Sequence, residues 1–261
     1  MFLAAWRFRH FIISSIVNDF RARFIRSRLG ALWMILHPLA QVAIFALILS
    51  TMLSAKLSGL NMPHAYAIYL MAGTLSWSLF SEIILRSLTI FIDNSNLIKK
   101  ISFPKISLLL ITLGSALVSN LFLLVSVMAV FLMLGHIPGI VALYLPLLIA
   151  LTLALSAGIG VMLGTLNVFM RDIGQIVPIA MQFLFWATPV VYVPKIVPEH
   201  YRHWLELNPV YHLVSAYQDV LVFGVPPQWS ALLWVAGAAA AALAVALALL
   251  RKASPEMVDV L

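Results

Sequence analysis

The sequence has 261 residues, of which 63% are apolar and only 10% are charged. Soluble domains are usually about 45–50% apolar and about 25% charged, so the composition excludes a soluble enzyme and a disordered chain. The absence of cysteine excludes a disulfide-stapled domain. We therefore expect an integral membrane protein, whose net charge of +7 reflects membrane topology and anionic lipid rather than nucleic acid.

Residues 1–30 predict an amphipathic helix in the membrane interface. One helical stripe holds apolar side chains, namely Trp6, Ile13, Val17, Phe20 and Phe24. The arginines fall mostly away from that stripe, as in helices that lie between head groups and acyl chains. A flexible basic leader is the alternative, but it does not explain the apolar stripe.

Six apolar stretches are long enough to cross a bilayer, which needs about 20 residues. They are residues 31–53, 66–90, 107–134, 140–170, 173–193 and 230–250. Gly135 and Pro138-Gly139 predict a tight turn, so the third and fourth spans are expected to be antiparallel neighbours. The predicted fold is thus an all-α transmembrane domain over residues 31–253, followed by a tail at 254–261.

Basic residues predict the orientation of these spans. Thirteen of the 16 lie on one predicted side: Arg7, Arg9, Arg21, Arg23, Arg26, Arg28, Arg86, Lys99, Lys100, Lys105, Arg171, Arg251 and Lys252. The other side has only Lys56, Lys195 and Arg202. Because basic loops stay on the cytoplasmic side, both termini are expected to be cytoplasmic.

The segment between the fifth and sixth predicted spans is expected to contain short helices. It predicts two short outer helices, near Glu199–Leu207 and Tyr211–Phe223, that lie on or dip into the outer leaflet, with Asn208-Pro209 as the turn between them. His200 and His203 follow Glu199 at a loosely metal-like spacing, but a solvated loop explains them better, and we expect no metal.

Polar and small residues within the spans have two interpretations. Glu82 precedes Arg86 by one helical turn, which favours either a structural ion pair or a polar wall at a pore mouth. Four amide side chains have two alternative roles, either to form hydrogen bonds between helices or to contact the substrate: Gln41, Asn120, Asn167 and Gln182. Glycines at 158, 160 and 164 predict close helix packing.

Motifs for catalysis and nucleotide binding are missing from the sequence. There is no Gly-x-x-x-x-Gly-Lys-Ser/Thr loop and no cluster of acids or histidines within a span. We therefore expect a protein that is not an enzyme and binds no cofactor, with any ATP and Mg held by a partner subunit.

Four motifs, in order along the chain, resemble membrane subunits of ABC-2 type polysaccharide exporters. They are RFIRSRLGALWMILHP at Arg23–Pro38, NSNLIKKISFP at Asn94–Pro104, NVFMRD at Asn167–Asp172, and Leu207-Asn208-Pro209 before an amphipathic helix. Gln218-Asp219 departs from the family, in which a basic residue is expected after Tyr217.

This resemblance implies a homodimer in the bacterial inner membrane, with two copies of a cytoplasmic ABC ATPase docked beneath it. The expected coupling helix to the ATPase comprises Asn94, Leu97, Ile98, Lys99, Lys100, Ile101, Phe103 and Pro104. Its apolar ridge suits a groove on a partner, whereas an ordinary basic loop would explain only the lysines. Arg171 and Asp172 are expected to make a second cytoplasmic contact, or to cap a helix end.

The resemblance further implies that the chain forms a channel for a lipid-linked polysaccharide, such as O-antigen on undecaprenyl diphosphate. The expected diphosphate contacts are Arg21, Arg23, Arg26 and Arg28. The candidates for the channel wall are Trp33, Tyr69, Trp77, Phe80, Glu82, Phe185 and Trp186. The expected outer gate is Tyr201, Trp204, Asn208, Pro209, Tyr211 and Tyr217. An ABC-2 exporter of a drug or small lipid is the alternative.

Overall fold

Helices make up nearly all of the structure, which is a computed structural model. It describes residues 8–24, 30–33, 36, 39–40, 43–44, 64–100 and 105–260, and these residues contain no strand. The elements are α2 (Arg9–Phe24), η1 (Gly30–Leu32), α4 (Ala65–Asp93), α5 (Ser95–Lys100), α6 (Lys105–Met133), η3 (Ile140–Tyr144), α7 (Leu145–Phe169), α8 (Ile173–Ala187), η4 (Pro194–Ile196), α9 (Glu199–Glu206), α10 (Pro209–Gln218), η5 (Asp219–Phe223), α11 (Trp229–Ala253) and α12 (Met257–Val260).

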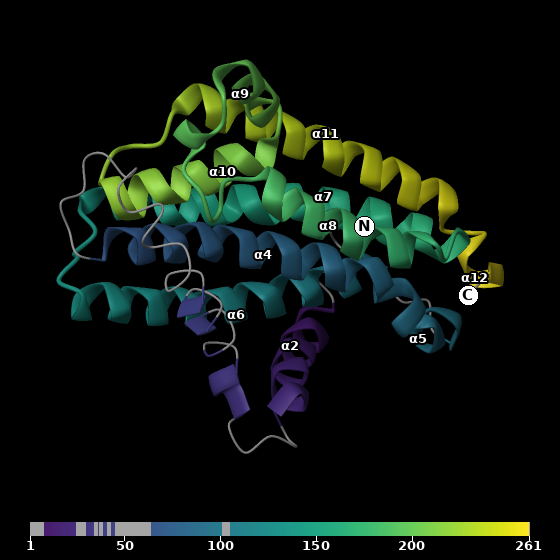
Figure 1. Ribbon diagram of the computed structural model, residues 1–261. Coiled ribbons are helices and arrows are strands. Elements are labelled where there is room, and N and C mark those ends of the chain that lie inside the picture. Colours follow the sequence, from purple (N-terminus) through teal and green to yellow (C-terminus); the bar gives the residue numbers. More distant parts are fainter. Residues whose placement is uncertain are drawn as a thin grey trace.

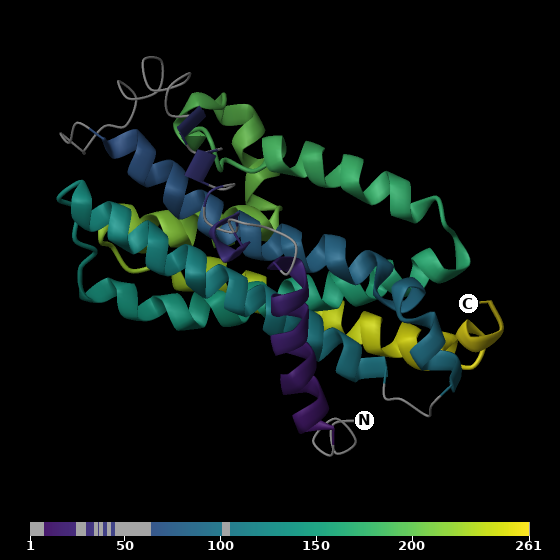
Figure 2. The same ribbon diagram turned by 90° about the horizontal axis from the view of Figure 1, so that it is seen from below.

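Four long helices, α4, α6, α7 and α11, lie side by side and form the body of the molecule (Figures 1 and 2). Each is long and apolar enough to cross a membrane, with η3 adding the first turns of the α7 span. These helices lie where the second, third, fourth and sixth spans were predicted. The predicted first span lies almost wholly outside the described residues.

The helix α8 is shorter than predicted, because it ends at Ala187 rather than near residue 193. Thr188 leaves the helical conformation with φ −107° and ψ 129°, as expected for a residue that precedes proline. At 1.5 Å per residue, 15 residues extend about 22 Å, whereas the bilayer core is about 30 Å thick. The predicted bounds of the fifth span were therefore wrong for residues 188–193, which are not part of the helix.

Glycines bring α7 close to both of its neighbours, as predicted. A Cβ atom at Gly158 would lie 2.7 Å from the backbone of Ala242 on α11. Equivalent atoms at Gly160 and Gly164 would collide with Ser87 on α4. The small residues therefore allow α7 to pack between α4 and α11.

Two of the predicted amides join helices. The Nδ2 atom of Asn120 on α6 donates to the carbonyl of Leu75 at 3.0 Å, and that of Asn167 on α7 donates to the carbonyl of Leu88 at 2.8 Å. Both acceptors belong to α4, which is the most buried long helix. Gln182 is exposed on α8, and Gln41 lies outside the described residues.

The two short helices predicted before the last span are present as α9 and α10, although Pro209 begins α10 instead of belonging to the turn. Their location at the outer leaflet stays a prediction. The Oδ1 atom of Asn208 accepts from the amide of Val210 at 3.0 Å and so caps α10, while its Nδ2 atom donates to Thr188 Oγ1 at the same distance. The chain continues into the π-helical turn η5, which is terminated by Gly224 with a φ of +63°. The ring of His136, in the turn after α6, contacts the carbonyl of Leu221 in η5 at 2.7 Å.

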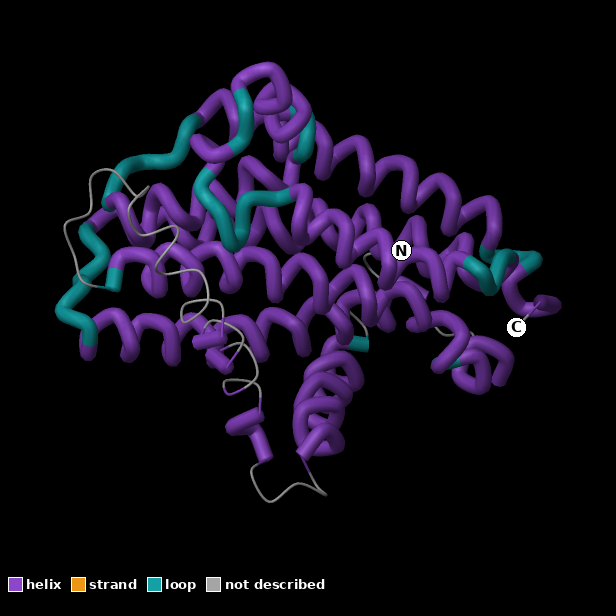
Figure 3. Tube along the Cα trace, viewed as in Figure 1, coloured by secondary structure: helices purple, strands orange, loops and turns teal. Residues whose placement is uncertain are grey.

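The helix α2 crosses α6 and extends away from the bundle (Figures 1–3). Ile16 packs against Gly114 of α6. Two members of the predicted lipid-facing stripe, Ile13 and Val17, are exposed. The helix is therefore confirmed, and its location in a membrane interface stays a prediction.

Candidate coupling and translocation sites

Basic side chains gather at one end of the bundle, which we call the basic end. Its described members are Lys99, Lys105, Arg171, Arg251 and Lys252, contributed by α5, α6, the turn before α8, and α11. In Figure 1 this end also holds α5 and α12, while η5 and the turn between α6 and α7 lie at the opposite end. The structure thus brings together basic segments that the sequence assigned to one side.

The segment that was predicted to be the coupling helix forms α5 and is attached to the end of α4. Asn94 caps α4 through a bond of 2.8 Å from its Nδ2 atom to the carbonyl of Ile90. The amides of Leu97 and Ile98 then bond back to the carbonyl of Asn94 at 3.0 and 3.1 Å, which begins α5. The remaining members Ile101, Phe103 and Pro104, and the side chain of Lys100, lie outside the described residues.

Only one side of α5 is available to a partner. Lys99 is exposed, whereas Ile98 is 7% exposed and belongs to a buried cluster with Leu250, Ala253 and Met257. Ile98 therefore attaches α5 to the C-terminal part of the chain instead of adding to an exposed ridge. The start of α6 is attached to the same part of the chain by Lys105, whose Nζ atom donates to the carbonyl of Ser254 at 2.6 Å.

The other residues that were predicted to contact the ATPase or the lipid diphosphate are exposed wherever the structure describes their side chains. Arg171 and Asp172 are both exposed in the turn between α7 and α8. Arg21 is exposed on α2, while Arg26, Arg28 and the side chain of Arg23 lie outside the described residues.

Arg86 joins two helices through two carboxylates. Its guanidinium lies 3.6 Å from Glu82, which confirms the predicted pair within α4, and 2.7 Å from Asp19 on α2. The shorter contact was not predicted. Its signal in the sequence is that Asp19 is the one acid among six arginines in residues 1–28. Because the pair joins α2 to α4, the structural interpretation of Glu82 is favoured over the pore wall.

Most of the predicted channel-wall aromatics meet where α8 contacts α4. The rings of Trp77 and Phe185 have centroids 5.3 Å apart, and Phe80 and Trp186 flank them at 5.9 and 5.6 Å. Phe80 is 2% exposed and Trp186 is 53% exposed, so the cluster extends from the core to the surface. Tyr69 is buried elsewhere on α4, and Trp33 is exposed.

The outer surface of α8 carries a mixed stripe that sequence reasoning did not identify. Gln175, Ile179, Gln182 and Trp186 follow one another at helical spacing, and all four are exposed. Neither glutamine side chain forms a hydrogen bond with the part of the chain that the structure describes. Amides facing lipid are unfavourable, so this stripe, which we call the amide stripe, indicates a wet or protein-covered surface.

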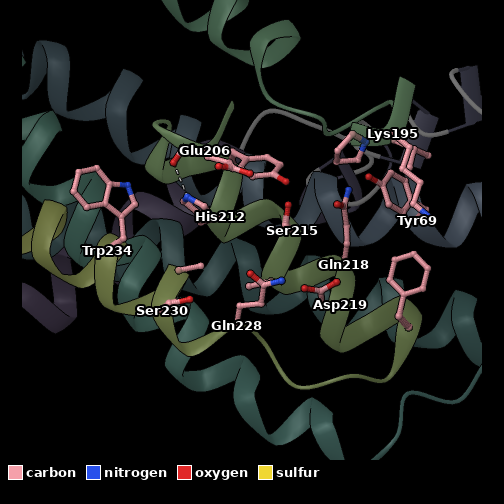
Figure 4. A pocket seen from close by; sticks show the side chains of 16 residues that line it. Tyr69, Lys195, Glu206, His212, Ser215, Gln218, Asp219, Gln228, Ser230 and Trp234 are labelled. Atoms are coloured by element: carbon pink, nitrogen blue, oxygen red, sulfur yellow. Dashed lines mark hydrogen bonds between the residues drawn. The ribbon is translucent and has the colours of Figure 1, made fainter. Parts of the chain in front are cut away.

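The predicted gate residues occupy different environments. Tyr217 is fully buried, Asn208 and Pro209 form the start of α10, and Tyr201 and Trp204 are exposed on α9. Tyr211 borders a cavity of about 670 Å³ between α10, η5 and α11, which also contains Tyr69 and Asp219 (Figure 4). Burial raises the pKa of the Asp219 carboxyl to about 6.

Comparisons with known proteins agree with this geometry. The family described as "ABC-2 type transporter" matches residues 12–222. An O-antigen export system permease protein, RfbA, of Klebsiella pneumoniae is 26% identical over 211 residues, or 79% of this chain and 78% of that protein. The Myxococcus xanthus protein of the same name is 28% identical, and the alignment covers 82% of this chain and 81% of that protein. The polysialic acid transport protein KpsM of Escherichia coli is 26% identical over 80% of each chain. Because the family match extends over most of the sequence, the chain belongs to the ABC-2 type transporters.

Proposed function

We propose that this protein is the membrane subunit of an ATP-driven exporter that moves a lipid-linked polysaccharide across the bacterial inner membrane. The observation that carries the proposal is the alignment, over about four-fifths of the chain, with proteins named for O-antigen export and polysialic acid transport. An all-helical bundle with four membrane-length helices fits this role. Undecaprenyl diphosphate is the carrier that we propose for the glycan.

The basic end is the proposed docking site of a separate ABC ATPase. In this proposal α5 is the coupling helix, with Lys99 on its exposed side, and Arg171 and Asp172 make the second contact. Movement of the ATPase would reach the bundle through α4, which α5 directly follows. A rigid-body shift of packed helices is a common way to switch a channel between two states.

Two copies of the chain are proposed to enclose the channel, with a total of six spans each and both termini in the cytoplasm. The amide stripe of α8 supports this arrangement, because Gln175 and Gln182 need polar surroundings within the membrane. In the channel, amides offer hydrogen bonds to sugar hydroxyls, and Trp186 offers an aromatic face. Trp77 and Phe185 then support the wall from behind.

The carrier lipid is proposed to approach along α2. The arginines at 21, 23, 26 and 28 suit the diphosphate, because guanidinium groups form strong bidentate hydrogen bonds with phosphate oxygens. At the other end of the passage, α9 and α10 are proposed to control the exit of the glycan. The capped start of α10 and the contact of His136 with η5 give that segment defined attachments.

The test of this function uses a strain in which the gene is deleted. We expect undecaprenyl-linked glycan to accumulate inside the cells and surface polysaccharide to disappear, with both effects reversed by a plasmid copy. Unchanged surface polysaccharide in the deletion strain would contradict the proposal. The alternative cargo, a drug or small lipid, predicts sensitivity to that compound with normal surface polysaccharide.

A further inference from the structure

A cavity lies between α10, η5 and the start of α11, and no ligand has so far been assigned to it (Figure 4). Its volume of about 670 Å³ is within the range of small-molecule sites, which is roughly 300–1,000 Å³. It lies at the end of the bundle opposite α5, on the same segment as the proposed exit. The chemistry of its lining therefore bears on what the protein meets after transport.

Polar side chains from three elements point into the middle of this cavity. Figure 4 shows Ser215 and Gln218 of α10, Asp219 of η5 and Gln228 before α11 around one space. Gln218 is 2% exposed, and its Nε2 atom donates to the carbonyl of Pro189 at 3.3 Å. That bond fixes the amide in place, so the centre of the cavity is preorganised.

Asp219 is a partly buried carboxylate in the lining of this cavity. Its carboxylate forms no hydrogen bond and no ion pair with the residues that the structure describes, although it is partly buried. An unpaired carboxylate removed from water is costly, and burial accordingly raises its pKa to about 6. A hydroxyl group supplied by a ligand would satisfy it, because an ionised carboxylate is purely an acceptor.

Aromatic rings border the polar centre in the view of Figure 4, with Tyr69 toward one end and Trp234 toward the other. The ring of Tyr69 packs edge-on against Phe223 with centroids 6.5 Å apart. Trp234 is 50% exposed, so a face of its indole is accessible from outside. Flat apolar faces beside hydrogen-bonding groups suit a ligand that is itself amphipathic.

The charges of the lining select among classes of ligand. A phosphate or other anion would be repelled by the carboxylates of Glu206 and Asp219. A cation would be attracted by them and repelled by Lys195, but an ammonium group offers no acceptor to the amide donors of the lining. An acyl chain would leave Gln228 and Asp219 without partners, which is unfavourable. A neutral molecule with many hydroxyls satisfies both the acceptors and the amide donors, while its C–H faces cover the aromatic rings.

We propose that this cavity binds a neutral sugar unit at the exit side of the protein. The identification of the ligand as part of the exported glycan rests on the function proposed above, whereas the binding chemistry stands on the cavity alone. Binding there would hold the emerging chain against α10 and α11 and would disfavour its return.

The test uses the purified full-length protein in lipid nanodiscs and saturation-transfer NMR. The probes are the neutral sugars glucose, galactose, mannose and rhamnose as methyl glycosides, with phosphocholine and ethanolamine as charged comparisons. We expect saturable binding of at least one neutral sugar. The dissociation constant should rise at least tenfold in Asp219→Ala and in Gln228→Ala, because each removes a hydrogen-bonding group from the cavity.

Matched controls are Glu199→Ala, an exposed acid on α9, and Asn18→Ala, an exposed amide on α2. Both should bind the sugar as the unaltered protein does. Since Gln228 is exposed, its replacement leaves the core intact even if Asp219→Ala folds poorly. The proposal is overturned if no neutral sugar binds, if the cavity variants bind it normally, or if phosphocholine or ethanolamine binds in a way that depends on Asp219. Normal surface polysaccharide in the deletion strain would refute the exporter function instead, without changing the nanodisc result.

Discussion

At the scale of single residues, glycines, which have no side chain, contribute to helix packing as much as the amide side chains do. Gly158, Gly160 and Gly164 let α7 approach two neighbours, and the carbonyl groups of α4 then accept hydrogen bonds from Asn120 and Asn167. The glycine spacing and the amides were recognisable in the sequence. Their partners Ser87, Leu75 and Leu88 were not, because no local pattern reports which helix lies opposite.

We expect Gly164→Leu to lower the stability of the bundle by about 1–3 kcal/mol or more, because the new side chain must displace the backbone at Ser87. Thermal unfolding of the purified protein measures the change. Gly237→Leu is the matched control, since a side chain at Gly237 on α11 meets open space. Equal melting temperatures for the two variants would show that the close contact is not required.

Asp219 predicts a dependence of stability on pH. Burial raises its pKa from the ordinary 3.8 to about 6, so the folded state binds the proton more tightly than the unfolded state. This contribution is fully present below pH about 4 and is lost as the pH rises through about 6. The wild type should therefore gain more thermal stability than Asp219→Asn on acidification from pH 7.5 to 4.5. Both proteins share the other charged or titratable groups that face the cavity, which are Glu206, His212, Lys195, Tyr69 and Tyr211. Parallel curves of thermal stability against pH would therefore contradict the assignment of this pH dependence to Asp219.

At the scale of elements, hydrophobic length predicted the long helices well and the short ones less well. The bounds of α4, α6, α7 and α11 fall close to the predicted limits, because about 20 apolar residues in a row have few alternatives. The end of α8 was missed because Val190, Val191 and Val193 continue the apolar run beyond Pro189. The contact of α12 with α5 was not predictable, since residues 254–261 show no periodicity.

That contact gives a prediction for the coupling site. Met257 is fully buried in the cluster that holds Ile98, so Met257→Asp should displace α5 and at least halve co-purification of the ATPase. Insertion of the long helices into the membrane should be unaffected. Glu256→Ala, at the exposed neighbouring position, serves as the control. If the ATPase binds Met257→Asp as strongly as the control, α12 does not position the coupling helix.

At the scale of the whole molecule, charge is the property that organises the chain. The apolar majority indicates a membrane protein and little more, whereas the basic residues cluster at one end with α5, α12 and the turn before α8. The channel could not be predicted in the same way. Aromatic residues recur throughout the sequence, and only the fold distinguishes buried Phe80 from exposed Trp186.

Reversing the charge at the basic end should weaken assembly. The double change Lys99→Glu and Lys100→Glu is expected to reduce ATPase co-purification at least tenfold, because it reverses two charges on the proposed docking surface. Membrane insertion, measured by fractionation, should remain normal. Lys56→Glu, on the predicted opposite side, should have no effect on assembly, and undiminished co-purification of the double variant would refute the docking site.

The bond between Lys105 and Ser254 joins positions 149 residues apart in the chain. Synthesis proceeds from the N-terminus, so α5 and Lys105 leave the ribosome long before Ser254 and Met257 exist to hold them. During that interval α5 has none of its lasting attachments to the end of the chain. Assembly with an ATPase would thus favour completed chains over nascent or truncated ones, which gives the cell a means to exclude unfinished channels from pairing with a motor.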